Sequence, residues 1–300
     1  MNEVTYTYRV AEQVFTVSGE ERCLIAAANM APFRVPNDSC DQPHFAIRLQ
    51  EVDAFGEIEE GFNHFFTDNS EADMPRIEVY RSNAQWLFRV AQVADAPVCC
   101  TVCADKAFRH AELFVLRGLP NHVMRFAIDN AAMLLFAFAT SHNRLLEMHA
   151  SVVVHEGKAR LFLGHSGTGK STHARQWLAQ FHQAYLLNDD NPVLLVDSNN
   201  RAWVYGSPWS GKTACYRNVV APVNALVRLE QYPKNVIERL QPLQAYASVI
   251  AAVSTIRWNH DVMSLLVPTI ERVAMNVPCF RLQCRPDEEA VQVCKKAIYP

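Results

Sequence analysis

Residues 164–171 read GHSGTGKS and fit G-x-x-x-x-G-K-[S/T], the pattern of a phosphate-binding loop. An apolar run, ARLFL, precedes the loop directly, and a helix-compatible run, STHARQWL, follows it. In such a strand–loop–helix unit, the backbone N–H groups of the loop and the helix N-terminus surround phosphate oxygens. The sequence therefore predicts a nucleotide site formed by consecutive residues: Gly164, His165, Ser166, Gly167, Thr168, Gly169, Lys170, Ser171 and Thr172.

Two side chains of this loop have the chemistry that a nucleotide–metal site needs. We expect Lys170 to place its ammonium on the β- and γ-phosphates, and the Ser171 hydroxyl to reach Mg²⁺. His165 in the loop and His173 on the following helix are weaker candidates, since a lone histidine more often faces solvent or packs in a core. The predicted cofactors are ATP and Mg²⁺.

A pair of carboxylates follows one helix and one strand later. Residues 186–190, LLNDD, read as an apolar strand that ends in acidic residues. One carboxylate can hold Mg²⁺ and the other can accept the proton of an attacking hydroxyl. We expect Asp189 to bind the metal and Asp190 to act as the base, with the reverse assignment left open. The alternative is a solvated Asn-Asp-Asp-Asn-Pro turn.

These segments together carry a family resemblance. His149-Ala-Ser, the loop GHSGTGKST and the run LLNDDNPV resemble the kinase domain of HPr kinase/phosphorylase, and also the nucleotide-binding part of phosphoenolpyruvate carboxykinase. The resemblance covers about residues 145–300. It implies that Asp189 and Asp190 supply the metal ligand and the general base. It also implies that His149 orients or tunes one of them, against the alternative of a core histidine.

The segment 206–213, GSPWSGKT, matches the same loop pattern, but we do not expect it to bind nucleotide. Pro208 removes an N–H donor, Trp209 is bulky where a phosphate loop wraps tightly, and the following ACYRNVVAP does not favour a helix. The segment is either a substrate loop or a structural loop with a solvated lysine. In the first case Lys212 and Arg217 would stabilise the transferring phosphoryl group or an anionic substrate.

The elements that position these residues divide the chain into three parts. Residues 1–118 are expected to form a β-rich N-terminal domain, because short runs of β-branched and aromatic residues alternate with polar turns. FAIRLQEV, for example, alternates as a half-buried strand does. Residues 119–146 are expected to form a connecting helix that begins near Pro120. Residues 147–300 are expected to form the nucleotide-binding, kinase-like domain.

Within this last part, MHASVVV and ARLFL are expected to pair as a hairpin around Gly157. Helices are predicted near residues 171–181, 242–253 and 261–275 and after Pro286. The predicted strands are AYLLND, WVYG, NALVRL and CFRLQC. Strands that alternate with helices are typical of an α/β layer. The predicted fold class is therefore α/β, a P-loop kinase domain of the HPr kinase/phosphoenolpyruvate carboxykinase type, preceded by the β-rich domain.

Composition narrows the classes of partner. The chain has 300 residues, of which 50% are hydrophobic, and this predicts a sizeable buried core. Its net charge of −3 argues against nucleic acid as the main partner. The apolar run 131–139 is about half of the roughly 20 residues that a membrane span needs, and the N-terminus lacks a signal-peptide pattern. Nine scattered cysteines indicate reduced thiols, and Cys100 and Cys103 fit a strand better than a metal site. We expect a soluble cytoplasmic protein, with a homo-oligomer left open.

The leading functional hypothesis is an ATP- and Mg²⁺-dependent phosphotransferase that acts on a hydroxyl of a protein or small-molecule acceptor. The segment 206–218 does not reproduce the substrate loop of HPr kinases, so the resemblance does not imply the acceptor. The alternative is a nucleotide-gated module that binds a peptide or protein without net transfer. A decarboxylating carboxykinase is disfavoured, because 300 residues leave no room for the organic-acid domain of those longer chains.

Overall fold

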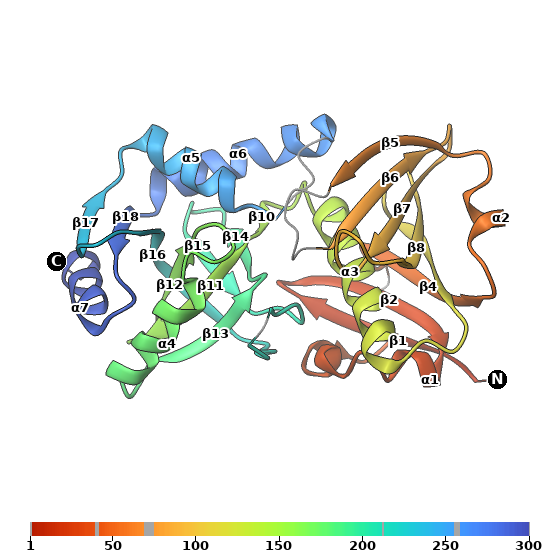
Figure 1. Cartoon of the computed structure of the whole chain (residues 1–300), viewed down its shortest axis with the longest axis horizontal. Coiled ribbons are helices and arrows are strands. Elements are labelled where there is room, and N and C mark those ends of the chain that lie inside the picture. The colour runs from red at the N-terminus through yellow and green to blue at the C-terminus, as the bar shows by residue number, and fades with distance from the viewer. Residues whose placement is uncertain (1, 40–41, 69–74, 212, 255–258, 300) are drawn as a thin grey trace. The chain divides into compact units, whose positions relative to one another are not determined.

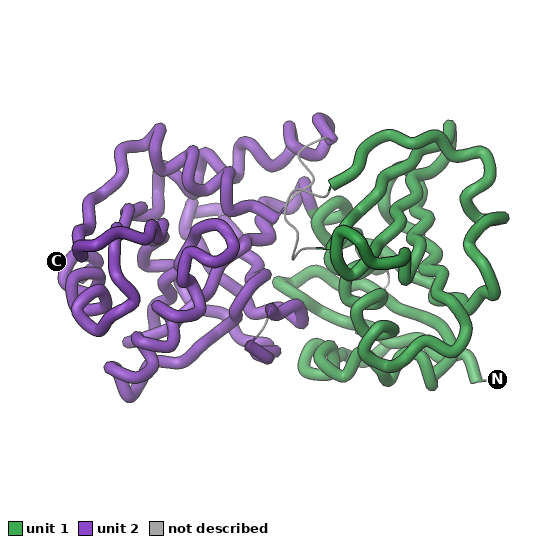
Figure 2. The backbone as a smooth tube through the Cα atoms, in the orientation of Figure 1, with its two compact units in different colours: residues 1–140 green, residues 141–300 purple. Residues whose placement is uncertain are grey.

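The computed structural model describes residues 2–39, 42–68, 75–211, 213–254 and 259–299. The chain forms two compact units, residues 1–140 and residues 141–300 (Figure 2). The boundary follows the end of the long helix that the sequence places near the middle of the chain. That helix runs from Asn121 to Ala139 and belongs to the first unit.

The first unit is built on a nine-stranded mixed sheet in the order β3-β1-β2-β4-β9-β8-β7-β6-β5 (Figure 1). The predicted alternation of FAIRLQEV is confirmed in β4, where Phe45, Ile47 and Leu49 are buried. Cys100 and Cys103 lie within a strand, β8, as predicted. The elements are β1 (Glu3–Val10), β2 (Gln13–Glu20), α1 (Glu21–Leu24), a 3₁₀ helix (Ala28–Phe33), β3 (Arg34–Val35), β4 (Phe45–Val52), α2 (Gly56–Glu59), β5 (Asn63–Asp68), β6 (Arg76–Arg81), β7 (Gln85–Ala91), β8 (Val98–Asp105), β9 (His110–Leu116) and α3 (Asn121–Ala139).

Helix α3 packs on β4, β8 and β9 through a row of apolar side chains that includes Met124, Ile128 and Leu135. Among the described residues it is the one helix long and apolar enough to cross a membrane. However, 61% of its apolar window is buried inside the protein. A core helix of a soluble protein has this degree of burial, and the second unit contains no comparable helix among its described residues.

The second unit contains a sheet in the order β10-β14-β15-β16-β12-β11-β13, and β18 extends it by pairing with β16 and β17 (Figure 1). Among the described strands of this unit, only the β12–β16 and β16–β18 pairs are parallel. The elements are β10 (Leu145–Glu147), β11 (Ala150–His155), β12 (Lys158–Leu163), α4 (Lys170–Gln180), β13 (Tyr185–Asp190), β14 (Val193–Val196), β15 (Ala202–Tyr205), β16 (Val220–Gln231), β17 (Val236–Arg239), α5 (Pro242–Ala252), α6 (His260–Asn276), β18 (Cys279–Cys284) and α7 (Glu288–Ile298).

The predicted fold class, an α/β P-loop kinase domain, is wrong. Strands account for 40% of the structure and helices for 29%, and both units contain a large mixed sheet, so the fold is β-rich. The error has a local cause. Strands β13 to β16 follow one another without a helix, and β14, β15 and β16 pair as antiparallel neighbours. Short connections of this kind make antiparallel pairs, whereas parallel pairs need a long crossover.

The hairpin that leads into the phosphate loop is confirmed. Strands β11 and β12 pair antiparallel from Ala150↔Leu163 to His155↔Lys158. The two turn residues, Glu156 and Gly157, both have positive φ angles, which suits a tight hairpin turn. Helix α4 then packs on this hairpin, with Trp177 and Ala174 buried in a core that also contains Phe162 and Val153.

Candidate functional site

The phosphate loop connects the end of β12 to the start of α4. Gly164 opens it with a φ of +148°, and a Cβ at this position would lie 2.5 Å from Thr168 Oγ1. Gly169 closes it in a left-handed conformation, φ +102°, directly before the first residue of α4. These two positions require glycine, because a side chain would be strained at both and would collide with the loop at the first. The loop thus ends at the N-terminus of α4, where the N-cap residue, Gly169, has no side chain to form a capping hydrogen bond.

Lys170 turns its side chain back into the loop. Its Nζ donates to the carbonyl oxygen of Gly164 at 2.8 Å and to that of His165 at 3.1 Å. The same Nζ lies 2.8 Å from His149 Nε2. The ammonium is therefore held within the loop, where the phosphate-binding pattern requires a positive charge.

Asp189 is held against the first turn of the same helix. The Ser171 hydroxyl donates to Asp189 Oδ1 at 3.0 Å, and the Asp189 side chain is buried, with the residue only 5% exposed. Asp189 comes from β13, which pairs with β11 through Ser151. The hydroxyl and the carboxylate that the sequence assigned to a metal ion therefore lie in hydrogen-bond contact.

Asp190 lies next to His149, the histidine that the sequence analysis assigned to orient one of the two carboxylates. Its Oδ1 lies 3.1 Å from His149 Nδ1. An ammonium has no lone pair and can only donate, so His149 Nε2 is the acceptor from Lys170. Nδ1 is then the ring nitrogen that faces the Asp190 carboxylate. The His149 imidazole thus lies between the Lys170 ammonium, to which it is hydrogen-bonded, and the Asp190 carboxylate.

The backbone at Asp190 is strained. Its φ of +151° lies in a region that residues with a side chain rarely adopt. Asp190 also pairs with Ser210 in an isolated antiparallel bridge. Such strain persists only where the surrounding structure imposes the conformation, and it is common at functional sites.

The described residues of the segment 206–217, namely 206–211 and 213–217, supply that surrounding structure, and we call this stretch the strap. It runs along β13, the edge strand of the sheet, and is tied to it at several points. Gly211 N donates to Asp189 O at 2.8 Å, and Ser210 Oγ donates to the same oxygen at 3.2 Å. A Cβ on Gly211 would lie 3.2 Å from both Cβ and Cγ of Asp190. The strap therefore sets the position of the carboxylate pair.

The backbone at the start of the strap lies close to the backbone at its end. Gly206 N donates to Val219 O at 3.0 Å, and a Cβ on Gly206 would lie 1.9 Å from Arg217 O. No larger residue fits there without moving the backbone. The side chain of Arg217 stacks over the Tyr185 ring at 5.6 Å, at the opposite end of β13 from Asp190. The structure therefore does not bring Arg217 to the carboxylates.

The remaining predicted residues divide into three groups. His165 and Ser166 are exposed on the loop, and Thr172 is partly exposed on α4. His173 is a core residue: its Nε2 accepts from Trp177 Nε1, and burial lowers its pKa to about 4. Lys212 lies outside the described residues.

Two side chains that the sequence reasoning missed hold the strap in place. Asn188, fully buried, donates from Nδ2 to Ser207 Oγ at 3.1 Å and to Trp209 O at 3.1 Å. Ser207, also fully buried, donates from Oγ to Asn191 O at 2.5 Å. The chain has only ten glycines, and two of them, Gly206 and Gly211, lie in the strap. Two glycines within six residues of a glycine-poor chain were the sequence signal that another backbone approaches this segment closely.

The donor atoms fit Mg²⁺. Ser171 and Asp189 offer oxygen ligands, which Mg²⁺ prefers, and this cation usually takes one or two carboxylates together with substrate phosphates. Among the described residues there is no group of three or more His, Cys, Asp and Glu side chains that would make an all-protein metal cage. A metal here would therefore need the phosphates of the nucleotide as additional ligands.

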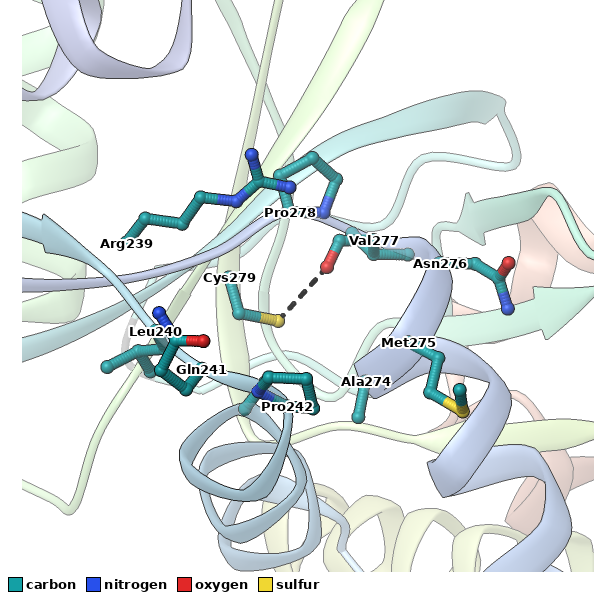
Figure 3. Close-up of a pocket in the computed structure, with 11 residues that line it drawn as sticks. Arg239, Leu240, Gln241, Pro242, Ala274, Met275, Asn276, Val277, Pro278 and Cys279 are labelled. Carbon is teal, nitrogen blue, oxygen red and sulfur yellow. Dashed lines mark hydrogen bonds between the residues drawn. The ribbon is translucent and has the colours of Figure 1, made fainter.

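A separate cavity of about 350 Å³ lies between the end of α6, the start of α5 and the β17–β18 pair (Figure 3). Arg239, Pro242, Met275 and Cys279 line it, and the Cys279 thiol is bonded to Val277 O at 3.3 Å. Burial raises the pKa of this thiol to about 12. None of the described residues that line the cavity belongs to the phosphate loop, β13 or the strap.

No protein-family model matches the chain, and no curated protein matches its sequence. The functional argument therefore depends on the site itself.

Proposed function

We propose that this protein binds ATP with Mg²⁺ and transfers the γ-phosphoryl group to a hydroxyl of a protein or small-molecule acceptor. The observation that carries the proposal is the convergence of four side chains from three separate segments. Lys170 and Ser171 begin α4, Asp189 is the penultimate residue of β13, and His149 precedes β11. The motif-level resemblance to HPr kinase/phosphorylase supports the same chemistry.

In this proposal the loop amides and Lys170 hold the triphosphate, and Ser171 and Asp189 hold Mg²⁺. The cation would neutralise charge on the phosphates. Asp190 accepts the proton of the acceptor hydroxyl, and the acceptor oxygen forms a bond to the γ-phosphorus as the bond to the β–γ bridging oxygen breaks. ADP leaves with that bridging oxygen. His149, whose Nδ1 lies 3.1 Å from Asp190 Oδ1, orients this carboxylate.

The first test is nucleotide binding by calorimetry, with and without Mg²⁺, for the wild type, Lys170→Ala and Asp190→Asn. We expect metal-dependent ATP binding in the wild type and a loss of about 10-fold or more in Lys170→Ala, because the charge on the phosphates is removed. Asp190→Asn should keep nucleotide binding. With a labelled γ-phosphate and cell extract as the source of acceptor, it should lose transfer by about 100-fold or more.

Two results would contradict the proposal. If the wild type binds no ATP, the loop does not act as a nucleotide site. If Asp190→Asn transfers phosphate at the wild-type rate, Asp190 is not the base. ATP binding without any consumption in the presence of acceptor would instead favour a nucleotide-gated binding module.

For location and partners, the proposal is a soluble cytoplasmic enzyme whose partners are nucleotide and one acceptor. Nucleic acid and membrane are not among them. A net charge of −3 gives no basic surface excess for phosphate backbones.

A further inference from the structure

Ser151 is a buried polar residue that the proposed mechanism does not use. It lies in the middle strand of the β12-β11-β13 group and is 0% exposed. Its hydroxyl has no hydrogen-bond partner among the described residues. An unpaired hydroxyl in a protein interior is unfavourable, and in a native structure it commonly marks a water or an ion.

The strand register shows where this hydroxyl points. Ser151 lies directly opposite Phe162 on β12 and directly opposite Asp189 on β13. Directly opposed residues of antiparallel strands have their side chains on the same face of the sheet. All three side chains therefore share one face.

That face is the one covered by α4. The Phe162 ring stacks edge-on against His173 of α4, with ring centroids 4.7 Å apart, and Asp189 accepts from Ser171 at the start of α4. Val153, two residues beyond Ser151 on the same face, packs in the core with Ala174. The Ser151 hydroxyl is thus buried beneath the first turn of α4, beside the carboxylate that the proposed function assigns to the metal.

We propose that Ser151 is a positioning residue for Asp189. In the present structure Asp189 Oδ1 accepts from Ser171. When Ser171 and Asp189 both turn to a divalent cation, that hydrogen bond is given up, and the Ser151 hydroxyl donates to the carboxylate in its place. Hydrogen bonds to a ligating carboxylate commonly change metal affinity by about 10- to 100-fold. This inference rests on the proposed function.

The test compares Ser151→Ala with Thr101→Val. Thr101, on β8 in the first unit, is also 0% exposed and also has a hydroxyl without a partner among the described residues, so it is a matched control. Binding of Mn²⁺ together with ADP is measured by calorimetry, and thermal unfolding is measured without metal. Ser151→Thr, which keeps the hydroxyl, is the conservative variant.

We expect Ser151→Ala to be at least as stable as the wild type without metal, since the substitution removes an unpaired buried hydroxyl. Its Mn²⁺ affinity should fall about 10- to 100-fold, while Thr101→Val keeps wild-type affinity and Ser151→Thr recovers most of it. Wild-type Mn²⁺ affinity in folded Ser151→Ala would overturn the inference and leave the proposed function standing. If the wild type and Thr101→Val both fail to bind Mn²⁺ with ADP, the proposed function fails and the inference fails with it.

Discussion

The position of Asp190 is set by contacts with His149, Ser210 and Gly211. Its carboxylate lies 3.1 Å from His149 Nδ1, and its backbone has a φ of +151° at the bridge with Ser210. Gly211 lies directly against it, so that a methyl group there would fit only if Asp190 shifted by a few tenths of an ångström. The base of the proposed reaction is therefore held from one side by an imidazole and from the other by a glycine.

We expect Gly211→Ala to displace Asp190 without removing any polar group. The new Cβ would meet Asp190 Cβ and Cγ at 3.2 Å, which is tighter than nine in ten real contacts of a Cβ atom, so Asp190 has to move slightly. Phosphoryl transfer should fall about 10- to 100-fold with ATP binding kept, because small displacements of a catalytic group are costly. A second readout is the ¹⁵N spectrum of the His149 ring, in which the share of the Nδ1–H tautomer should decrease.

Gly56→Ala is the matched control for this substitution. A Cβ on Gly56 meets nothing within 4 Å, so transfer and the His149 spectrum should both stay as in the wild type. If Gly211→Ala also leaves both unchanged, the strap does not position Asp190. A changed spectrum without detectable transfer in the wild type would retain the positioning role and count against the phosphotransferase.

Helix α4 joins the loop to the core of the second unit. Its first turn carries Lys170 and Ser171, and its buried face carries His173, Ala174 and Trp177. The Trp177 indole donates to His173 Nε2 at 3.1 Å, so the histidine is held as a neutral acceptor. The orientation of the helix N-terminus thus depends on a histidine that must stay uncharged.

His173 should make the second unit sensitive to acid. Burial lowers its pKa from 6.5 to about 4, so the unfolded chain binds the proton first as the pH falls. The stabilisation is complete above pH 6.5 and is lost progressively between pH 6.5 and pH 4. Urea unfolding of the second unit should show a loss on the order of 2 kcal/mol between pH 7 and pH 5.

In His173→Gln the loss of unfolding free energy between pH 7 and pH 5 should largely disappear. The control variant His182→Gln, at an exposed position, should keep this loss. The comparison uses the difference between the two pH values, so a general loss of stability at pH 7 does not affect it. An equal pH dependence in His173→Gln and the wild type would contradict this assignment.

The molecule consists of two units, and each contains a buried titratable group. The two groups should change the stability of their units in opposite directions as the pH falls. In the first unit Asp129 of α3 accepts from Asn29 Nδ2 at 2.7 Å, and burial raises its pKa to about 6. The native first unit therefore holds this proton more tightly than the unfolded chain does. Its stability should increase as the pH falls, in the range where His173 destabilises the second unit.

For Asp129 we expect stability to rise as the pH falls from about 6 to about 4. A raised carboxyl pKa is unfavourable above pH 6 and is relieved below it. The change is on the order of 2–3 kcal/mol by the usual conversion of a pKa difference. Asp129→Asn should remove this pH dependence and stabilise the first unit at pH 7. The Asp53 side chain is 87% exposed, so the control variant Asp53→Asn should have neither effect.

Tryptophan fluorescence can separate the two units in this experiment. Of the five tryptophans in the sequence, only Trp86 belongs to the first unit. Trp86→Phe therefore leaves a signal from the second unit alone, and the difference from the wild type reports the first. A first unit whose stability is unchanged between pH 4 and pH 6 would refute the role of Asp129.

Much of the local structure follows from neighbouring residues. Helix α4, the β11–β12 hairpin around Gly157, and the helices and strand after residue 241 lie close to their predicted bounds. These elements depend on side-chain periodicity, on glycine at a turn and on residues that begin or end a helix. All of these signals act over a few positions.

The phosphate loop also follows from consecutive residues, because its glycines, lysine and serine form one strand–loop–helix unit. Tertiary structure alone decided the pairing of the strands outside the β11–β12 hairpin, and with it the fold class, since these pairs join segments far apart in the chain. It also decided that the strap lies on β13, that Gly211 touches Asp190, and that Ser151 faces Asp189 beneath α4. The sequence can name the groups that do chemistry, but the packing of distant segments determines which of them meet.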